Sequence, residues 1–275
     1  MSIRSISAAV IAALALVAVP VLTAPPSPHA GAPSQAAAVT PAAPAPDPAP
    51  GPAPVQSPEA VIAALRKPEN STGNIADAVE AATGARGWMS SDMKPISTGK
   101  IVGRAWTALM RPVLKSDTRT YPNYLLQVLD EAPAGSVLVY VMQDGLEIAA
   151  MGNLMATTAK VRGLEATVID GAVRDVTELR AIGHQVFSRR VSPATSVGRM
   201  VSVSKQTPVR CADVLVTPGD YIVGDADGVV VVPQGAAADQ VVALLVDYDA
   251  RESKMVPIIQ REKSMLKALE IYGRY

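Results

Sequence analysis

The distribution of charge and proline at the start of the chain decides which residues can build a folded core. No Lys, Arg, Asp or Glu occurs between Arg4 and Asp47, and residues 6–24 are almost entirely Ala, Val, Leu and Ile. Twelve prolines follow within residues 24–58. Because proline has no N–H to donate and fixes φ, this second stretch predicts an extended, polyproline-like spacer. The folded domain is therefore expected over residues 59–275.

The apolar run behind a single basic residue has the pattern of a secretory signal. It is also long enough for an uncleaved anchor, because a membrane-spanning helix needs about 17 to 25 apolar residues. In both alternatives Arg4 stays cytoplasmic and the rest of the chain lies on the far side of the membrane. We expect residues 1–24 to be a signal peptide or membrane anchor and residues 25–58 a disordered Pro/Ala-rich linker. The protein is then exported, and is either periplasmic or tethered to the membrane through its N-terminus.

The overall composition excludes several classes of protein. The chain has 25 Lys and Arg against 25 Asp and Glu, so no surplus of positive charge indicates a nucleic-acid partner. One cysteine cannot form an intramolecular disulfide, and one cysteine with two histidines cannot fill a four-ligand zinc site of the Cys/His type. An aliphatic globular domain remains, large enough for one core.

Alternation of short aliphatic runs with helical patterns predicts an α/β fold. The expected strands are 137–142, 167–169, 186–187, 221–223 and 229–232, and the expected helices are 75–82, 124–131, 154–161, 176–182 and 236–254. Residues 229–232 are apolar at every position, which is typical of a strand covered on both faces. Pro257 is expected to end the long helix and to leave a second helix over 258–271.

The most informative stretch is 151–180, which predicts a glycine, a helix, a strand and a second helix beginning at Asp175. Both helix starts then lie at the same ends of neighbouring elements. Free N–H groups at a helix start bind carboxylates and phosphates, and Gly152 allows such an anion to approach closely. The amides expected to bind this anion belong to Asn153, Leu154 and Met155.

Two charged residues follow the strand in this stretch. Arg174 could give the same anion a bidentate contact, and Asp175 offers a hard oxygen ligand for Mg²⁺ or Mn²⁺. A plainer interpretation is also open. Asp175 and Glu178 have the spacing of a capping box, which by itself explains both, and Arg174 could be a solvated surface residue. On this interpretation Gly152 and Gly163 only mark the ends of helices.

Several motifs resemble those of the RraA-like superfamily. They are Gly-Asn-Leu at 152–154, Ala-Lys-Val-Arg-Gly at 159–163, Ile-Asp-Gly-Ala-Val-Arg-Asp at 169–175, Pro-Gly-Asp at 218–220 and Gly-Asp-Ala-Asp-Gly-Val at 224–229. That superfamily holds the class II 4-hydroxy-4-methyl-2-oxoglutarate and 4-carboxy-4-hydroxy-2-oxoadipate aldolases, together with the regulators of ribonuclease E activity. The resemblance covers nearly all of 59–233, in the family's order.

The resemblance implies a swivelling β/β/α-type single domain that assembles as a trimer or a dimer of trimers, with sites between protomers. It also implies a divalent-metal pyruvate aldolase or oxaloacetate decarboxylase acting on small 2-oxo or hydroxy dicarboxylic acids. In this chain Arg174 would hold the pyruvyl group, Asp175 would organise Mg²⁺ or Mn²⁺ with its waters, and the amides after Gly152 would bind the anion. The regulators lack the aspartate after the arginine, so Asp175 favours the aldolase branch.

The chain departs from the family pattern at two places. Asn153 stands where aldolases commonly carry a glutamate, and residues 116–124, with Arg119, Tyr121 and Pro122, replace the usual Asp-Asn pattern. In the family, a carboxy-terminal glutamate from a neighbouring subunit belongs to the water network of the site, and Glu252 is the nearest match to it in this chain. Glu252 can equally be a solvated residue on the surface of a helix. These departures motivate an alternative function, a non-catalytic binding or regulatory module with the same fold.

Overall fold

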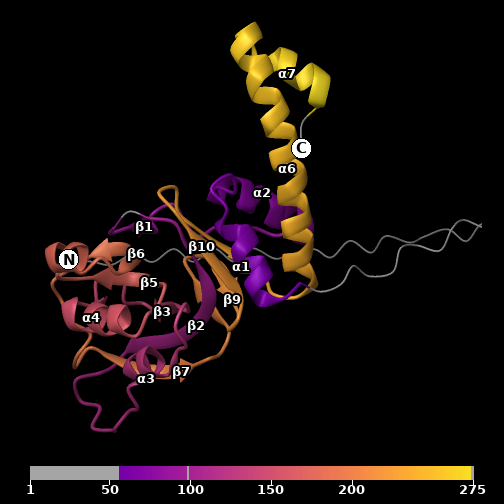
Figure 1. The fold of residues 1–275 in the computed structure, drawn as a ribbon. Helices are drawn as coiled ribbons and strands as arrows, with labels where there is room; N and C mark the ends of the chain where they lie inside the picture. The colour runs from indigo at the N-terminus through magenta and orange to yellow at the C-terminus, as the bar shows by residue number, and fades with distance from the viewer. Residues whose placement is uncertain (1–55, 98, 274–275) are drawn as a thin grey trace, which may run out of the picture. The chain divides into compact units, whose positions relative to one another are not determined.

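The computed structural model describes residues 56–97 and 99–273, so the expected leader and nearly all of the expected linker lie outside the described residues. The described part is an α/β domain with one nine-stranded mixed sheet, as the alternation of patterns predicts (Figure 1). Within the described ranges, no helix combines the length and the apolar character needed to cross a membrane.

The centre of the sheet is parallel and its edges are antiparallel. Strands β2, β3, β5 and β6 run parallel, and the main path through the sheet is β1-β6-β5-β3-β2-β10-β11. Two strands branch from it, since β4 pairs with β5 and β7 pairs with β2. The strand bounds are β1 Lys94–Pro95, β2 Ile101–Pro112, β3 Val137–Met142, β4 Ala149–Met151, β5 Ala166–Val173, β6 Gln185–Val191, β7 Met200–Lys205, β10 Tyr221–Gly224 and β11 Val229–Val232. A separate two-stranded ribbon joins β8 (Val209–Cys211) to β9 (Val214–Val216).

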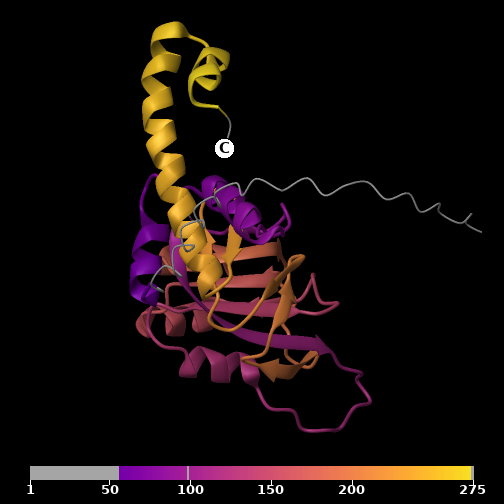
Figure 2. The same cartoon turned by 90° about the vertical axis from the view of Figure 1, so that its right-hand side faces the viewer.

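Helices cover the sheet in two groups. Helices α3 (Tyr124–Glu131), α4 (Asn153–Val161) and α5 (Val176–Ile182) connect the parallel strands and share one apolar core with them. Helices α1 (Pro58–Arg66), α2 (Thr72–Thr83) and α6 (Ala236–Glu262) pack on β10 and β11 in another core. Figure 2 shows the second group from the side, with α7 (Met265–Tyr272) beside the far end of α6.

The strands in the middle of the sheet are buried on both faces. In β3 the side chains alternate between two cores, with Val137 on one side and Leu138 on the other. In β11, Val229 and Val231 enter one core while Val230 and Val232 enter the core beneath the α2 and α6 helices. The prediction that 229–232 is covered on both faces is thus confirmed.

The expected end of the long helix at Pro257 is wrong. Helix α6 passes through Pro257 and continues to Glu262, and the next helix begins at Met265 instead of residue 258. A proline removes one N–H and crowds the preceding turn, and a long helix can absorb this locally as a bend. The helix stops at Lys263, whose φ of 50° is left-handed, and Ser264 then caps α7 by accepting a hydrogen bond from the Lys267 N–H.

His184 is a buried polar residue next to the sheet. Its side chain is 1% exposed, and its Nε2 lies 3.0 Å from the Thr167 hydroxyl. Its Nδ1 is buried and has no partner among the described residues. Burial lowers the pKa of His184 to about 4, and the charge of Lys160 adds to this effect. The folded protein therefore keeps this ring neutral.

We predict that His184 makes the fold sensitive to mild acid. The unfolded chain protonates this residue near pH 6.5 and the folded chain only near pH 4, so the stabilisation is present above pH 6.5 and is lost as the pH falls. Its loss between pH 7 and pH 5 amounts to about 2 kcal/mol. Urea unfolding at both pH values should show this loss in the native chain and a much smaller one in His184→Gln. Equal losses in both proteins would contradict the assignment.

Candidate functional site

The ends of two neighbouring strands bring the predicted site residues together. Strand β4 runs parallel to β5, and the Arg174 N–H donates a hydrogen bond to the Met151 carbonyl over 3.1 Å. Helix α4 begins immediately after Gly152, and helix α5 begins immediately after Asp175. The two helix starts are therefore adjacent, as the sequence pattern predicts.

The Asp175 carboxylate contacts the start of α4 and not the start of its own helix. Its Oδ2 accepts a hydrogen bond from the Asn153 N–H at 3.0 Å and lies 3.6 Å from Arg174 Nε. Asp175 stands at the N-cap of α5, yet its side chain makes no capping hydrogen bond there. The capping-box interpretation of Asp175 and Glu178 is therefore wrong, and this carboxylate links two elements.

The backbone at Asp175 explains why its side chain points across to α4. Its φ of 59° and ψ of 41° are left-handed. Residues other than glycine rarely adopt this backbone conformation, although aspartate and asparagine tolerate it better than most. Such a conformation persists where the surrounding structure enforces it, and it is often found at functional sites. Here it turns the carboxylate away from α5 and toward the amide of Asn153.

Glycine is required at position 152 because no room is left there for a Cβ, and not because of the backbone conformation. Its φ of −135° is open to any residue. A Cβ at this position would lie 2.5 Å from Asp175 Oδ2, which is too short for a carbon atom, and 3.0 Å from Arg174 Nε, which is a tight contact. Only glycine lets the charged pair approach the start of α4 this closely.

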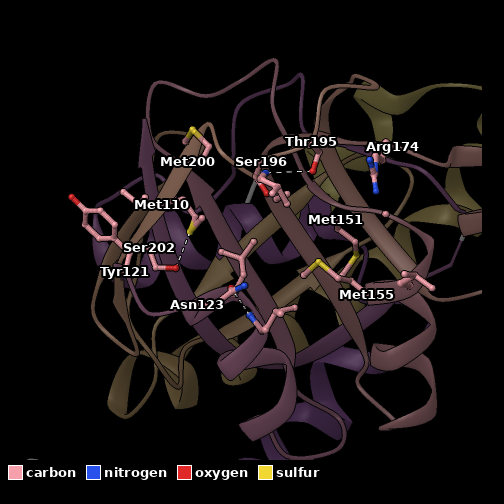
Figure 3. Close-up of a pocket in the computed structure, with 18 of the residues that line it drawn as sticks. Met110, Tyr121, Asn123, Met151, Met155, Arg174, Thr195, Ser196, Met200 and Ser202 are labelled. Carbon is pink, nitrogen blue, oxygen red and sulfur yellow. Dashed lines mark hydrogen bonds between the residues drawn. The ribbon is translucent and has the colours of Figure 1, made fainter. Parts of the chain in front are cut away.

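Arg174 of the charged pair lines a cavity of about 490 Å³ (Figure 3). One wall contains Arg174 and residues 152–155, and the facing wall contains Arg119, Tyr121 and Asn123 from the segment that departs from the family pattern. Asp175 is not among the residues that line this cavity; its side chain is 31% exposed, and that of Arg174 is 43% exposed. Gly152, Asn153, Leu154, Met155 and Arg174, all predicted from sequence, thus share one cavity.

Several lining residues are not indicated by any local motif. They are Met110 from β2, Thr195 and Ser196 from the loop before β7, and Met200 and Ser202 from β7. Strand pairing between β2 and β7 brings these distant segments to the cavity. Only the pairing pattern could have revealed them, since methionine and serine carry no motif by themselves.

Arg119 is paired within its own loop. Its Nε and Nη2 donate to the Asp117 carboxylate at 3.0 Å and 2.6 Å, and the Tyr121 hydroxyl donates to the same carboxylate at 2.8 Å. These contacts hold the pKa of Asp117 well below its usual range and raise the pKa of Arg119. The loop therefore brings a neutralised ion pair to the cavity wall.

The donor set for a metal at this site is small. In the part of the chain that the structure describes, no three His, Cys, Asp or Glu side chains lie close enough together to hold an ion. Asp175 Oδ2 is occupied by Asn153, while Oδ1 accepts no hydrogen bond from any described residue. Mg²⁺ keeps several waters and needs only one or two protein carboxylates, so Asp175 fits a water-rich ion. Glu252 lies on α6 and is not among the residues that line this cavity.

The chain belongs to the RraA-like family, whose model, described as aldolase/RraA, matches residues 72–231, more than half of the chain. Among its relatives, a Halalkalibacterium halodurans protein named "Putative 4-hydroxy-4-methyl-2-oxoglutarate aldolase" is 32% identical over 169 residues, which cover 58% of this chain and 71% of that protein. Protein DlpA of Legionella pneumophila is 32% identical over 166 residues, 59% of this chain, and the match spans only 26% of the length of DlpA.

A solved structure supports the same family. RraAS2 of Streptomyces coelicolor, described as an unusual member of the RNase ES inhibitor RraA protein family, superposes with a TM-score of 0.62. It is 26% identical, and the match covers 72% of this chain and 96% of that one. The expected RraA-like α/β fold is thereby confirmed. The family includes both proteins named as aldolases and proteins named as ribonuclease inhibitors.

We predict that Gly152→Ala disrupts the charged pair while leaving the fold intact. The added Cβ would force Asp175 and Arg174 away from the start of α4, so the affinity for a small carboxylate such as oxalate should fall roughly tenfold or more. Calorimetric titration measures this. Gly73→Ala is the matched control, because a Cβ there would meet its nearest atom at an ordinary 3.5 Å. Similar oxalate affinity in both variants would show that close approach at Gly152 is not needed.

Proposed function

We propose that the chain is a divalent-metal-dependent carbon–carbon lyase, a class II pyruvate aldolase or oxaloacetate-decarboxylase-type enzyme acting on small 2-oxo acids. The observation that carries this proposal is the junction of Arg174, Asp175 and the start of α4 beside one cavity. Family membership and the aldolase names among the relatives support it. The dicarboxylic acids expected from the resemblance are the first substrates to test.

The residues at this junction have complementary parts in such a reaction. The guanidinium of Arg174 would pair with the carboxylate of the 2-oxo acid, and the N–H groups of Leu154 and Met155, which have no partner one turn earlier in the helix, would donate to it. Asp175 would hold the divalent cation through Oδ1. When bound, Mg²⁺ or Mn²⁺ supplies a Lewis acid that draws charge toward the keto oxygen.

Asp175 also controls access to the first amide of α4. Its Oδ2 holds the Asn153 N–H, so an incoming carboxylate meets the two following amides first. Asn153 has an amide side chain where a carboxylate is usual in aldolases, and so it can donate and accept hydrogen bonds without adding negative charge. The junction is therefore less acidic than the family pattern, which favours binding of an anion beside Arg174.

A second candidate function is a non-catalytic binding or regulatory module. Two observations favour it: among the described residues no three His, Cys, Asp or Glu side chains lie close enough together to hold a metal ion, and RraAS2 is described as a member of an inhibitor family. In such a module the cavity would bind a carboxylate without breaking a bond. Ligand binding without turnover is the result that would select this function.

The proposed activity is tested by pyruvate release from 4-hydroxy-4-methyl-2-oxoglutarate and from oxaloacetate with Mg²⁺ or Mn²⁺. We expect Asp175→Asn to lower turnover at least about a hundredfold, because asparagine tolerates the same backbone but removes the charge that holds the cation. Arg174→Lys should lose roughly tenfold or more, since an ammonium cannot make the bidentate contact. Addition of EDTA should abolish turnover. Equal rates in Asp175→Asn and the native chain would remove this residue from the mechanism.

We further propose a homo-oligomer, a trimer or a dimer of trimers, located on the far side of the membrane or tethered to it. Leu154 and Val197 line the cavity mouth and are 78% and 79% exposed, an apolar rim that a second copy could cover. The location rests on the leader pattern alone. Cell fractionation followed by light scattering of the recovered protein tests both points, and a cytosolic monomer would contradict both.

A further inference from the structure

The cavity has two chemically different ends. Arg174 and the start of α4 form a charged end, whereas the floor that leads away from them is formed by methionines. Figure 3 shows Met151 and Met155 near Arg174, and Met110 and Met200 further along toward Tyr121. Methionine is unbranched and polarizable, and it adapts its shape to apolar groups. A ligand held by its carboxylate at Arg174 would therefore extend over an apolar, adaptable surface.

Two of the polar side chains along this floor, those of Asn123 and Ser202, already have partners inside the protein. Asn123 accepts a hydrogen bond from the Leu126 N–H at 3.2 Å as the N-cap of α3. Ser202 Oγ accepts from the Tyr124 N–H at 2.9 Å and donates to Met110 Sδ at 3.1 Å. Figure 3 draws the bond between Asn123 and the Leu126 N–H and the bond between Ser202 and Met110 as dashed lines. These contacts fix the wall of the cavity, and they engage the Asn123 carbonyl and the Ser202 hydroxyl within the protein.

Among the described residues that line the far end, the one cation already has a carboxylate partner. Arg119 is the cation of that wall, and two of its nitrogens are bound to the Asp117 carboxylate. The Tyr121 hydroxyl donates to the same carboxylate. A second ligand carboxylate placed here would compete with the Asp117 carboxylate for this guanidinium and would be repelled by it, which weakens its binding.

We propose that this cavity selects 2-oxo acids whose substituent beyond the keto group is an extended apolar chain, and that it disfavours a second carboxylate at the end of that chain. This inference rests on the proposed function, because it places the 2-oxo acid carboxylate at Arg174. Within the 2-oxo acids of the proposed function, it ranks 4-hydroxy-2-oxo acids with an alkyl or aryl group on C4 above the dicarboxylic acids that the resemblance implies. The cavity of about 490 Å³ leaves room for such a group.

The corresponding cleavage balances without a further reactant. The bond between C3 and C4 breaks, C4 becomes a carbonyl carbon as its hydroxyl loses a proton, and C3 gains a proton. The products are pyruvate and an aldehyde or ketone that carries the apolar group. The reverse reaction joins the same two molecules, so the apolar carbonyl compound is the partner that the methionine floor would recognise.

The test compares 2-oxo acids by calorimetric titration of the full chain at constant Mg²⁺. Pyruvate, 2-oxobutyrate, 2-oxopentanoate and 2-oxohexanoate differ by one methylene each, and we expect affinity to rise roughly threefold to fourfold per step. The decisive pair is 2-oxopentanoate against 2-oxoglutarate, which have five carbons each and differ in a terminal methyl or carboxylate. We expect 2-oxoglutarate to bind at least about tenfold more weakly.

Methionine variants test whether the cavity floor causes the expected preference for longer apolar 2-oxo acids. Met200→Gln places a polar amide on the floor and should reduce the ratio of 2-oxohexanoate to pyruvate affinity roughly tenfold, whereas Met200→Leu should keep the ratio. Met265→Gln is the matched control, because Met265 lies on α7, is 54% exposed and does not line this cavity. Thermal unfolding of each variant verifies that it is folded, and a Met200→Gln ratio equal to that of the control overturns the proposed floor.

The two levels of the proposal fail in different ways. If 2-oxoglutarate binds as tightly as 2-oxopentanoate while pyruvate binding still depends on Arg174, the selectivity is wrong and the proposed function stands. If pyruvate does not bind, or if Arg174→Ala leaves its affinity unchanged, the proposed function fails and the selectivity fails with it. Affinity that rises with chain length and falls with a terminal carboxylate supports both.

Discussion

The hydrogen bond from the Asn153 N–H to the Asp175 carboxylate holds the whole site together. It joins the starts of two helices that follow neighbouring parallel strands, and it requires the missing Cβ at Gly152 and a left-handed backbone at Asp175. Each of these features is unfavourable or unusual alone. Together they place a carboxylate, a guanidinium and helix amides at one point beside a cavity, which is the arrangement that carboxylate and metal binding both need.

Much of the fold could be predicted from sequence because it follows from periodicity. The run at 137–142 and the helix at 124–131 have the predicted bounds, since a buried parallel strand and an amphipathic helix each have a clear pattern. Strand β2 could not be recognised in the same way, because Gly103, Arg104 and Arg111 interrupt its apolar residues. The helix through Pro257 was also beyond prediction, as a local rule for proline does not register the length of the helix around it.

The candidate site was predictable in part for a similar reason. Residues 152–155 and 174–175 lie within one strand–helix unit, so their proximity follows from local order along the chain. The role of Asp175 as a link to α4 could not be read from spacing, because the same spacing also fits a capping box. The part of the methionine floor formed by Met110 and Met200 depends on the pairing of β2 with β7, which are far apart in sequence, and no short motif encodes it.

The left-handed backbone at Asp175 also limits how this protein can change over generations. Most replacements at this position would destabilise the turn, whereas asparagine and glycine would preserve it. A descendant that lost this carboxylate but kept the fold is therefore expected to carry Asn or Gly at residue 175. The residue at position 175 in other members of the family would show which of them have lost the carboxylate.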